Sequence, residues 1–555
     1  MKKHIVKMLM ATALATSIVF LVAGCGNEAN YDESVAMNNG ASSVEFPLEN
    51  RYTLKGFIGY PLDVGEDPND RTIFKRLETE TNIHVDWKVV RSEKCLDDSS
   101  IKNVNADRLP DFVFSAGLRD CDLLRYADEK KIIHVEEYID TSMPNLKKIF
   151  DKYPQYRVMC TDTEGHIWAF PWIEQLGTEK ASIQTVGNMS FINKKWLDYL
   201  GIEVPKTTEE FEKALIAFKD NALELQKVFG IKDSIIPMSC IINDGNQDPS
   251  IIINGFGEGI GDTDEQRHIA VKDDKKVVCT ATQSGYKNGI AWLHKLYEEG
   301  LVDPDSFSQN WHEYVSKGKE GRFGVCFGWD ISNIDNVDDW IPLPALTADT
   351  RNITPENCSF TGGFERGRCV ITTAAQDPSL VCAWIDKMYF PFQSIQNNWG
   401  TYGEDDEFDI FEIGTNEAGK KMLKHSPLGK ISPIKVRECE SVGGPLAVLD
   451  EYYGKYVTCP DDAQYRLKWI KDIYTPDMNT KYVYPNVLMN EADSEELAVL
   501  QVGIVKHIND KKSEWIKSGF DDSEWNAYVS KLYTLGLDKY IEIYQKYFDK
   551  WVEHQ

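Results

Sequence analysis

The chain has 555 residues, of which 42% are hydrophobic and 11% aromatic, which is enough apolar material for a globular protein of two or three domains. Its 88 acidic residues outnumber its 61 lysines and arginines, so the formal net charge is −27 at pH 7. Such a surface repels phosphate backbones and anionic lipid headgroups. The composition therefore argues against a nucleic-acid partner and disfavours a strongly anionic ligand.

The first predicted element is an export signal. Residues 1–7 carry three lysines, residues 8–20 form a short apolar run, and Ala23 and Gly24 precede Cys25. This order is typical of a secretory signal, and a cysteine at the cleavage point indicates a lipoprotein that is acylated at Cys25. The alternative is an ordinary secretory signal in which Cys25 is incidental. We expect residues 1–24 to be removed and the mature protein to sit at the extracellular face of the cell membrane, held by its lipid anchor alone.

Residues 25–50 are predicted to form a flexible tether. They are rich in Asn, Ser, Gly and Glu and have no apolar periodicity, so they cannot bury a core. No later segment approaches the 18 or so uninterrupted apolar residues of a membrane-spanning helix.

Strands and helices alternate after the tether. The hydrophobic pattern predicts strands at 51–60, 83–90 and 112–114, a helix at 70–81, and a continuation of this pattern at 132–139. Helices are predicted at 208–218 and 286–299, and the chain is expected to be mostly helical from residue 495. Trp196, Trp292, Trp384 and Trp525 fall at helical spacing and are expected to be core residues. The pattern is that of an α/β protein whose first lobe contains a largely parallel sheet.

Cysteine usage favours buried thiols. Eleven cysteines remain after Cys25, an odd number that excludes complete intramolecular pairing, and no C-x-x-C motif suggests zinc or redox chemistry. Cys326 and Cys382 lie within apolar runs, which is typical of small buried side chains. Disulfides remain the alternative.

Several segments together resemble one protein family. They are 109–111 (LPD), 165–171 (GHIWAFP), 190–197 (SFINKKWL), 200–207 (LGIEVPKT), 296–304 (LYEEGLVDP) and 525–537 (WNAYVSKLYTLGL). In sequence and order they resemble the family 1 extracellular solute-binding proteins, the receptors of sugar ABC importers. The resemblance implies a two-lobed, periplasmic-binding-protein-like α/β fold of type II, with hinge-connected lobes and a ligand cleft between them. It also implies a monomer that binds an oligosaccharide and delivers it to the membrane subunits of an ABC permease.

The resemblance sets the expected domain boundaries. Lobe 1 is expected to comprise residues 51–170 and about 365–425, and lobe 2 about 190–345 and about 430–555. Longer family members often carry a calcium loop after the helix that ends in AFK, but here residues 219–224 lack the alternating oxygen ligands that calcium needs. No metal and no cofactor are expected.

The candidate ligand contacts are aromatic, carboxylate and hydroxyl side chains at loops near the lobe junctions. A sugar presents an apolar face of C–H groups and a rim of hydroxyls, so its site needs aromatic plates beside hydrogen-bonding groups. The context of Trp329 is similar to the tryptophan segment that stacks sugar in maltose-binding proteins. Each candidate could instead be a core residue. The candidates are Ser115, Trp172, Glu174, Trp329, Asp330, Phe364, Arg366, Trp399, Tyr402 and Glu404.

Enzyme chemistry finds little support in the sequence. There is no G-x-S-x-G and no H-E-x-x-H motif, and Lys421 replaces the Ser or Thr that a P-loop at residues 414–420 would need. Carboxylate pairs carry no information among 88 acids. The chain is therefore expected not to be an enzyme. The alternatives are a surface glycan hydrolase or lyase, and a receptor for a peptide or another non-sugar solute.

Overall fold

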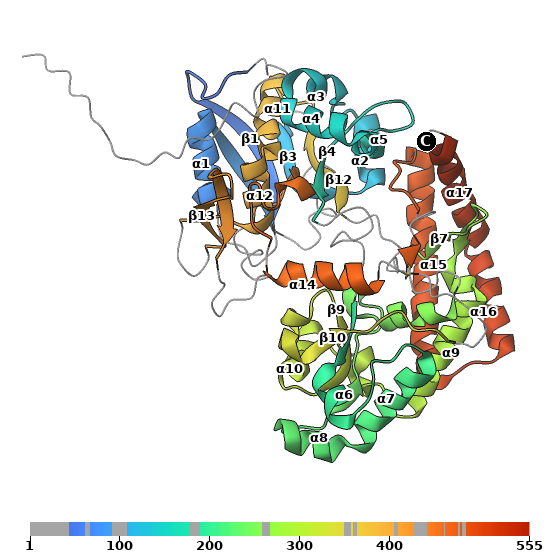
Figure 1. The fold of residues 1–555 in the computed structure, drawn as a ribbon. Helices are drawn as coiled ribbons and strands as arrows, with labels where there is room; N and C mark the ends of the chain where they lie inside the picture. Colours follow the sequence, from blue (N-terminus) through green and yellow to red (C-terminus); the bar gives the residue numbers. More distant parts are fainter. Residues whose placement is uncertain are drawn as a thin grey trace, which may run out of the picture.

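A computed structural model of the chain describes residues 44–60, 67–91, 108–176, 189–257, 267–348, 357–358, 363–403, 409–426, 441–459, 461–474, 478–479 and 484–553. Cys25, the expected signal and most of the expected tether lie outside these residues. The described part forms two bodies, each built around its own sheet and its own hydrophobic core (Figure 1). The two-lobed α/β class expected from the sequence is thus confirmed.

The first body contains a six-stranded sheet in the order β15-β4-β12-β3-β1-β2. Its strands are β1 Tyr52–Tyr60, β2 Ile83–Arg91, β3 Phe112–Leu118, β4 Phe170–Glu174, β12 Phe364–Ile371 and β15 Leu446–Val448. Strand β12 runs antiparallel to both β3 and β4, whereas the other neighbouring pairs are parallel. Five of its six strands therefore run in the same direction, so the sheet is largely parallel as expected. Strand β12 alone runs against them, because the chain leaves this body after β4 and re-enters it along β12.

Helices and a hairpin surround this sheet. They are α1 Thr72–Thr81, α2 Asp120–Asp128, α3 Glu136–Ser142, α4 Pro144–Lys152, α5 Pro154–Cys160, α11 Pro378–Asp386, α12 Pro391–Trp399, β13 Phe411–Thr415 and β14 Lys421–His425. The core contains a ring cluster in which Trp384 of α11 lies 5.2 Å from Phe112 and 6.4 Å from Trp87 between ring centroids. Helix α1 buries Ile73, Phe74 and Leu77, the stripe that its sequence spacing predicts.

The second body contains a four-stranded sheet in the order β10-β5-β9-β6. Its elements are β5 Met189–Asn193, α6 Lys194–Leu200, α7 Thr208–Asp220, α8 Ala222–Phe229, β6 Ile236–Met238, β7 Ile269–Val271, β8 Val277–Cys279, α9 Ser284–Glu298, α10 Trp311–Lys319, β9 Phe323–Gly328 and β10 Trp340–Pro342. The side chain of Asn193 accepts a hydrogen bond from the backbone of Trp196, so β5 passes directly into α6.

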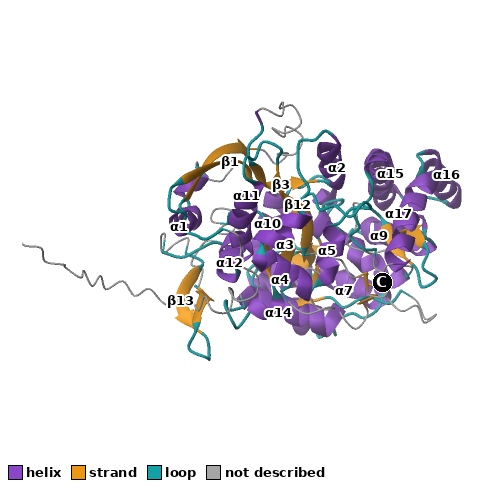
Figure 2. Ribbon diagram, turned by 90° about the horizontal axis from the view of Figure 1, so that it is seen from above, coloured by secondary structure: helices purple, strands orange, loops and turns teal. Residues whose placement is uncertain are grey.

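The chain ends in helices, as its sequence predicts. They are α14 Asp461–Trp469, α15 Glu491–Ser518, α16 Asp522–Thr534 and α17 Leu537–Glu553. Helix α15 packs along α9 of the second body and also contacts α2 of the first. Helices α15, α16 and α17 gather on the side of the molecule opposite hairpin β13–β14 (Figures 1 and 2). Among the described helices, none combines the length and the apolar character needed to cross a bilayer.

Several expectations meet the structure differently. The predicted tryptophan core is confirmed, since Trp196, Trp292, Trp384 and Trp525 are all buried. Residues 132–139 do not continue as a strand, because only an isolated bridge at Ile132 precedes helix α3. The expected start of lobe 2 at about residue 430 also differs from the structure: β15 pairs with β4, and residues up to Val457 pack in the first core.

Eight cysteines whose side chains the structure describes carry free thiols. Cys459 is half-buried. The seven buried cysteines are Cys121, Cys160, Cys240, Cys279, Cys326, Cys369 and Cys382. Burial raises the pKa of Cys160 to about 12, so this thiol stays protonated and unreactive.

Candidate functional site

The two bodies meet at a small apolar cluster around Leu176. This residue follows β4 and is 2% exposed. Partly buried side chains from both bodies pack against it; they are Trp329, Trp399, Tyr453, Cys459 and Leu467. We call these six residues the inter-lobe cluster. Two of the predicted aromatic plates, Trp329 and Trp399, therefore come together from different bodies.

A polar group lies beside this cluster on the first body. Trp172 and Glu174 sit on β4, and Asn398 sits at the end of α12 next to Trp399. The Asn398 amide donates to Glu174 Oε1 at 3.0 Å and accepts from Trp172 Nε1 at 3.2 Å. Glu174 and Asn398 are both buried, whereas Trp172 is half-buried. One amide thus fixes an aromatic plate and a carboxylate in a single arrangement.

The opposing group comes from the second body and α14. Trp329 and Asp330 follow strand β9, and Asp330 accepts a hydrogen bond from the backbone of Ser332. The guanidinium of Arg466 lies over the Trp329 ring at 3.7 Å and donates to the Trp329 carbonyl oxygen. Burial lowers the pKa of Arg466 to about 9, against the opposing effect of Asp330, so the group is a cation at neutral pH. It occupies one face of the Trp329 ring.

Ser115 joins the first group from the middle of β3. It has a left-handed backbone, with φ 53°, and its hydroxyl donates to the Val442 carbonyl at 3.2 Å. The amides of Val442 and Gly443 in turn donate to the carbonyl of Asn397, the residue before Asn398. A non-glycine residue in this conformation costs roughly 1 to 3 kcal/mol and persists only where its surroundings hold it, which is common at binding sites.

Three other predicted ligand contacts, Phe364, Tyr402 and Arg366, are occupied by contacts with other side chains of the protein. Phe364 is buried and stacks on Tyr156 at 5.8 Å between ring centroids. Tyr402 lies under the guanidinium of Arg76, which is 4.0 Å from its ring centroid.

Arg366 is 5% exposed and bonds to protein groups on several sides. It donates to Asp120, to the Met159 carbonyl and to Asn486. Since Asn486 lies in the segment that leads into α15, Arg366 ties two distant parts of the chain together. We therefore leave Phe364, Arg366 and Tyr402 out of the site. Glu404 lies outside the described residues.

Sequence reasoning missed Asn398 and Arg466. Asn398 belongs to an unusual run on α12 in which Gln393, Gln396, Asn397 and Asn398 are all buried. A run of amides at Q-S-I-Q-N-N-W was the available signal, because buried amides require hydrogen-bond partners. Arg466 had no comparable signal, since its partner Trp329 lies 137 residues away.

The place where relatives were expected to carry a calcium loop is a helix junction here. Helix α7 ends at Asp220 and α8 begins at Ala222, with only Asn221 between them. The Asn221 amide donates back to the Ala217 carbonyl at 2.8 Å. This tight connection leaves no loop of alternating oxygen ligands at that point.

Comparison with known proteins gives one strong sequence match. The chain is 39% identical over 544 residues, 98% of each protein, to the fructooligosaccharide ABC transporter substrate-binding protein FusA of Streptococcus pneumoniae serotype 4. A scan against models of known protein families found no match.

Solved structures agree with this match. FusA in complex with kestose has a TM-score of 0.81 and 40% identity, over 91% of this chain and 100% of the other. An EF-hand mutant of FusA in complex with fructo-nystose gives the same values. An HMO-binding, ABC-transporter-associated solute-binding protein from Bifidobacterium longum infantis shares the fold, with a TM-score of 0.73 and 22% identity over 90% of this chain and 99% of the other.

Proposed function

The chain belongs to the substrate-binding proteins of ABC transporters, and on that premise we propose that it captures a fructooligosaccharide outside the cell membrane and delivers it to a permease. The family confirms the resemblance drawn from the sequence. It also confirms the expectation that the chain is not an enzyme, because the relatives are substrate-binding proteins. The named ligand of FusA supplies the proposed sugar class.

The proposal rests above all on the match to FusA along nearly the whole of both chains. The groups at the junction of the two bodies add chemical support. Trp172, Trp329 and Trp399 supply half-buried indole surface, and Glu174 and Asp330 supply acceptors beside it. Aromatic faces pack on sugar C–H groups while carboxylates accept hydrogen bonds from hydroxyls. We propose that the binding site comprises Ser115, Trp172, Glu174, Trp329, Asp330, Asn398 and Trp399.

We further propose how the protein works in the membrane. Acylated Cys25 and the segment between it and residue 44 hold a monomer near the permease. This tether is shorter than the expected 25–50, because Val44, Phe46 and Leu48 pack against the first core. Ligand draws the two bodies together across the inter-lobe cluster, and the permease reads the closed form. The boundaries of the lobes follow the sheets, with the second lobe beginning beyond β4 and again beyond Val457.

Calorimetric titration of the full chain with kestose tests the sugar class. Maltotriose is the matched control, since it is a trisaccharide built only of glucose, and a neutral tripeptide tests the peptide alternative. We expect saturable binding of kestose and no binding of maltotriose or the tripeptide. At 100 times its dissociation constant the sugar should raise the free energy of unfolding by about 2.7 kcal/mol. The proposal would be contradicted if the chain bound the tripeptide or maltotriose but did not bind kestose.

The same samples test for turnover. After hours with bound kestose, chromatography should recover the trisaccharide intact. The appearance of fructose and sucrose would instead support the hydrolase alternative.

A further inference from the structure

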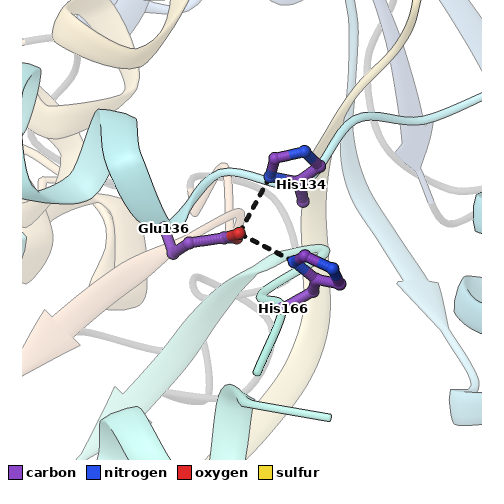
Figure 3. A group of neighbouring side chains, drawn as sticks. All are labelled: His134, Glu136 and His166. Carbon is purple, nitrogen blue, oxygen red and sulfur yellow. Dashed lines mark hydrogen bonds and ion pairs between the residues drawn. The ribbon is translucent and has the colours of Figure 1, made fainter. Parts of the chain in front are cut away.

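Two histidines and a glutamate meet on the first body, away from the inter-lobe cluster. Both imidazoles turn their Nδ1 atoms toward the same carboxylate oxygen (Figure 3). Glu136 Oε1 lies 2.9 Å from Nδ1 of His134 and 2.8 Å from Nδ1 of His166. The ligand atoms of the three residues all lie within 4.8 Å of one another.

The backbone beneath these side chains is firmly held. The Val135 amide donates to the Ile167 carbonyl at 2.8 Å, and the Ile167 amide donates to Glu136 Oε2 at 3.1 Å. These two bonds join the start of α3 to the segment that leads into β4. His166 thus meets His134 and Glu136 although it lies about 30 residues away.

Asp162 organises the turn that carries His166. One of its oxygens accepts from the amides of Glu164 and His166 at 2.8 and 2.9 Å, and the other accepts from Trp168 Nε1 at 2.7 Å. The Trp168 ring then packs edge-on against both imidazoles. Such supporting contacts orient metal ligands in proteins and limit their rotamers.

We propose that His134, Glu136 and His166 bind a divalent transition-metal ion, zinc being the best fit. Two imidazoles and one carboxylate form a common three-ligand set for zinc, with a further position left for water. The side chains are half-exposed, at 50% for His134, 21% for Glu136 and 37% for His166, so an ion can enter from solvent. Calcium and magnesium prefer all-oxygen sites and do not suit this set.

The two nitrogen–oxygen distances require only a small adjustment. Ligand atoms of a tetrahedral zinc ion lie roughly 3.3 Å apart, so the nitrogens must each move away from the carboxylate oxygen by about half an ångström. The ion takes the place of the Nδ1 protons, which pass to solvent. Carboxylates already gather here, since Asp162 and Glu164 lie on the turn that carries His166 beside Glu136. A cation is therefore favoured.

Titration of the full chain with zinc chloride tests the site, with cobalt(II) absorption spectra to report on the ligands. The variants are His134→Ala and His166→Ala. The matched control is His84→Ala, because His84 Nδ1 also lies 2.9 Å from a carboxylate, that of Glu78, but has no second histidine beside it. Circular dichroism checks that each variant is folded.

We expect one zinc ion per chain, with affinity that falls about tenfold or more in each of the two variants and is unchanged in His84→Ala. The cobalt spectrum should change in the same two variants, and an excess of calcium should not displace either ion. The proposal is overturned if the wild-type chain binds no zinc, or if His134→Ala and His166→Ala bind it as tightly as the wild type does.

Discussion

The guanidinium of Arg466 lies 3.7 Å from the ring centroid of Trp329 and donates to the carbonyl oxygen of the same residue. Arg466 comes from α14, which lies between the two bodies in Figure 1. The arginine therefore fixes the indole of Trp329 from one side, whereas Leu176 packs against this residue from the first body. A plate held in this way loses little side-chain entropy when a ligand stacks on it.

Replacing Trp329 by Ala should weaken kestose binding by about 1 to 3 kcal/mol, the range for a buried aromatic contact. It should also lower the melting temperature without ligand, because Arg466 loses its stacking partner. The control is Trp311→Ala, another half-buried tryptophan of the second body, which packs against Tyr314 on α10. Calorimetry should show normal affinity for the control. If both variants lost the same amount of kestose affinity, Trp329 would not belong to the binding site.

Asn398→Asp should destabilise the protein in a pH-dependent way. The amide donates to Glu174 Oε1 at 3.0 Å, so the substitution places two carboxylates in contact. At pH 7.5 the free energy of unfolding should fall by about 1 to 3 kcal/mol, and the loss should shrink at pH 4.5 as the pair binds a proton. Urea denaturation measures both values. Asn288→Asp, at an exposed position of α9, should change stability by less than about 0.5 kcal/mol at either pH.

His425 should make the protein sensitive to acid. Burial lowers the pKa of His425 to about 4 from its ordinary 6.5, so the folded state holds a neutral imidazole. The unfolded chain binds this proton below about pH 6.5, and stability therefore falls as the pH drops from 6.5 to 4, by about 3 kcal/mol for this residue. His425→Gln should flatten the dependence by that amount in urea titrations. His312→Gln, which is exposed on α10, should leave it unchanged.

The buried pair Lys512 and Asp248 ties α15 to the second body. Lys512 Nζ lies 2.8 Å from Asp248 Oδ2, and the two side chains are 1% and 0% exposed. Lys512→Met leaves a buried carboxylate without its counter-charge and should cost about 3 to 5 kcal/mol. The neighbouring variant Lys511→Met removes a partly exposed ion pair with Glu514 and a distant contact with the Trp515 ring, and it should cost less than about 1 kcal/mol. Comparable unfolding midpoints for the two variants would show that the buried pair is not needed.

Cys25→Ser should release the protein from the membrane or leave an uncleaved precursor. Serine cannot be acylated as the cysteine thiol is, so the signal would not mature into an anchor. Fractionation and mass analysis of the N-terminus provide the measurement. A variant that remains bound to the membrane after its signal is removed would refute the lipid anchor.

Local patterns were sufficient for much of the fold. The apolar stripe of α1 and the buried tryptophans 196, 292, 384 and 525 follow from helical spacing, because a side chain's face depends on its near neighbours in the helix. The direction of β12 did not follow, since it depends on where the chain re-enters the first body. For the same reason, the sequence-based boundary at about residue 430 comes too early. Strand β15, which follows it, still pairs with β4 in the first body.

The sequence by itself determined the family and predicted an export signal and the residue types that a sugar site needs, because these depend on composition and on motifs within a few residues. Only the tertiary structure decided which of those side chains face one another. The sequence makes Arg366 a candidate ligand contact, but in the structure its guanidinium donates to Asp120 and Asn486, which lie in distant segments. Asn398 and Arg466 gained their roles through partners more than 130 residues away. Such pairings arise from the packing of the two bodies, which no local pattern encodes.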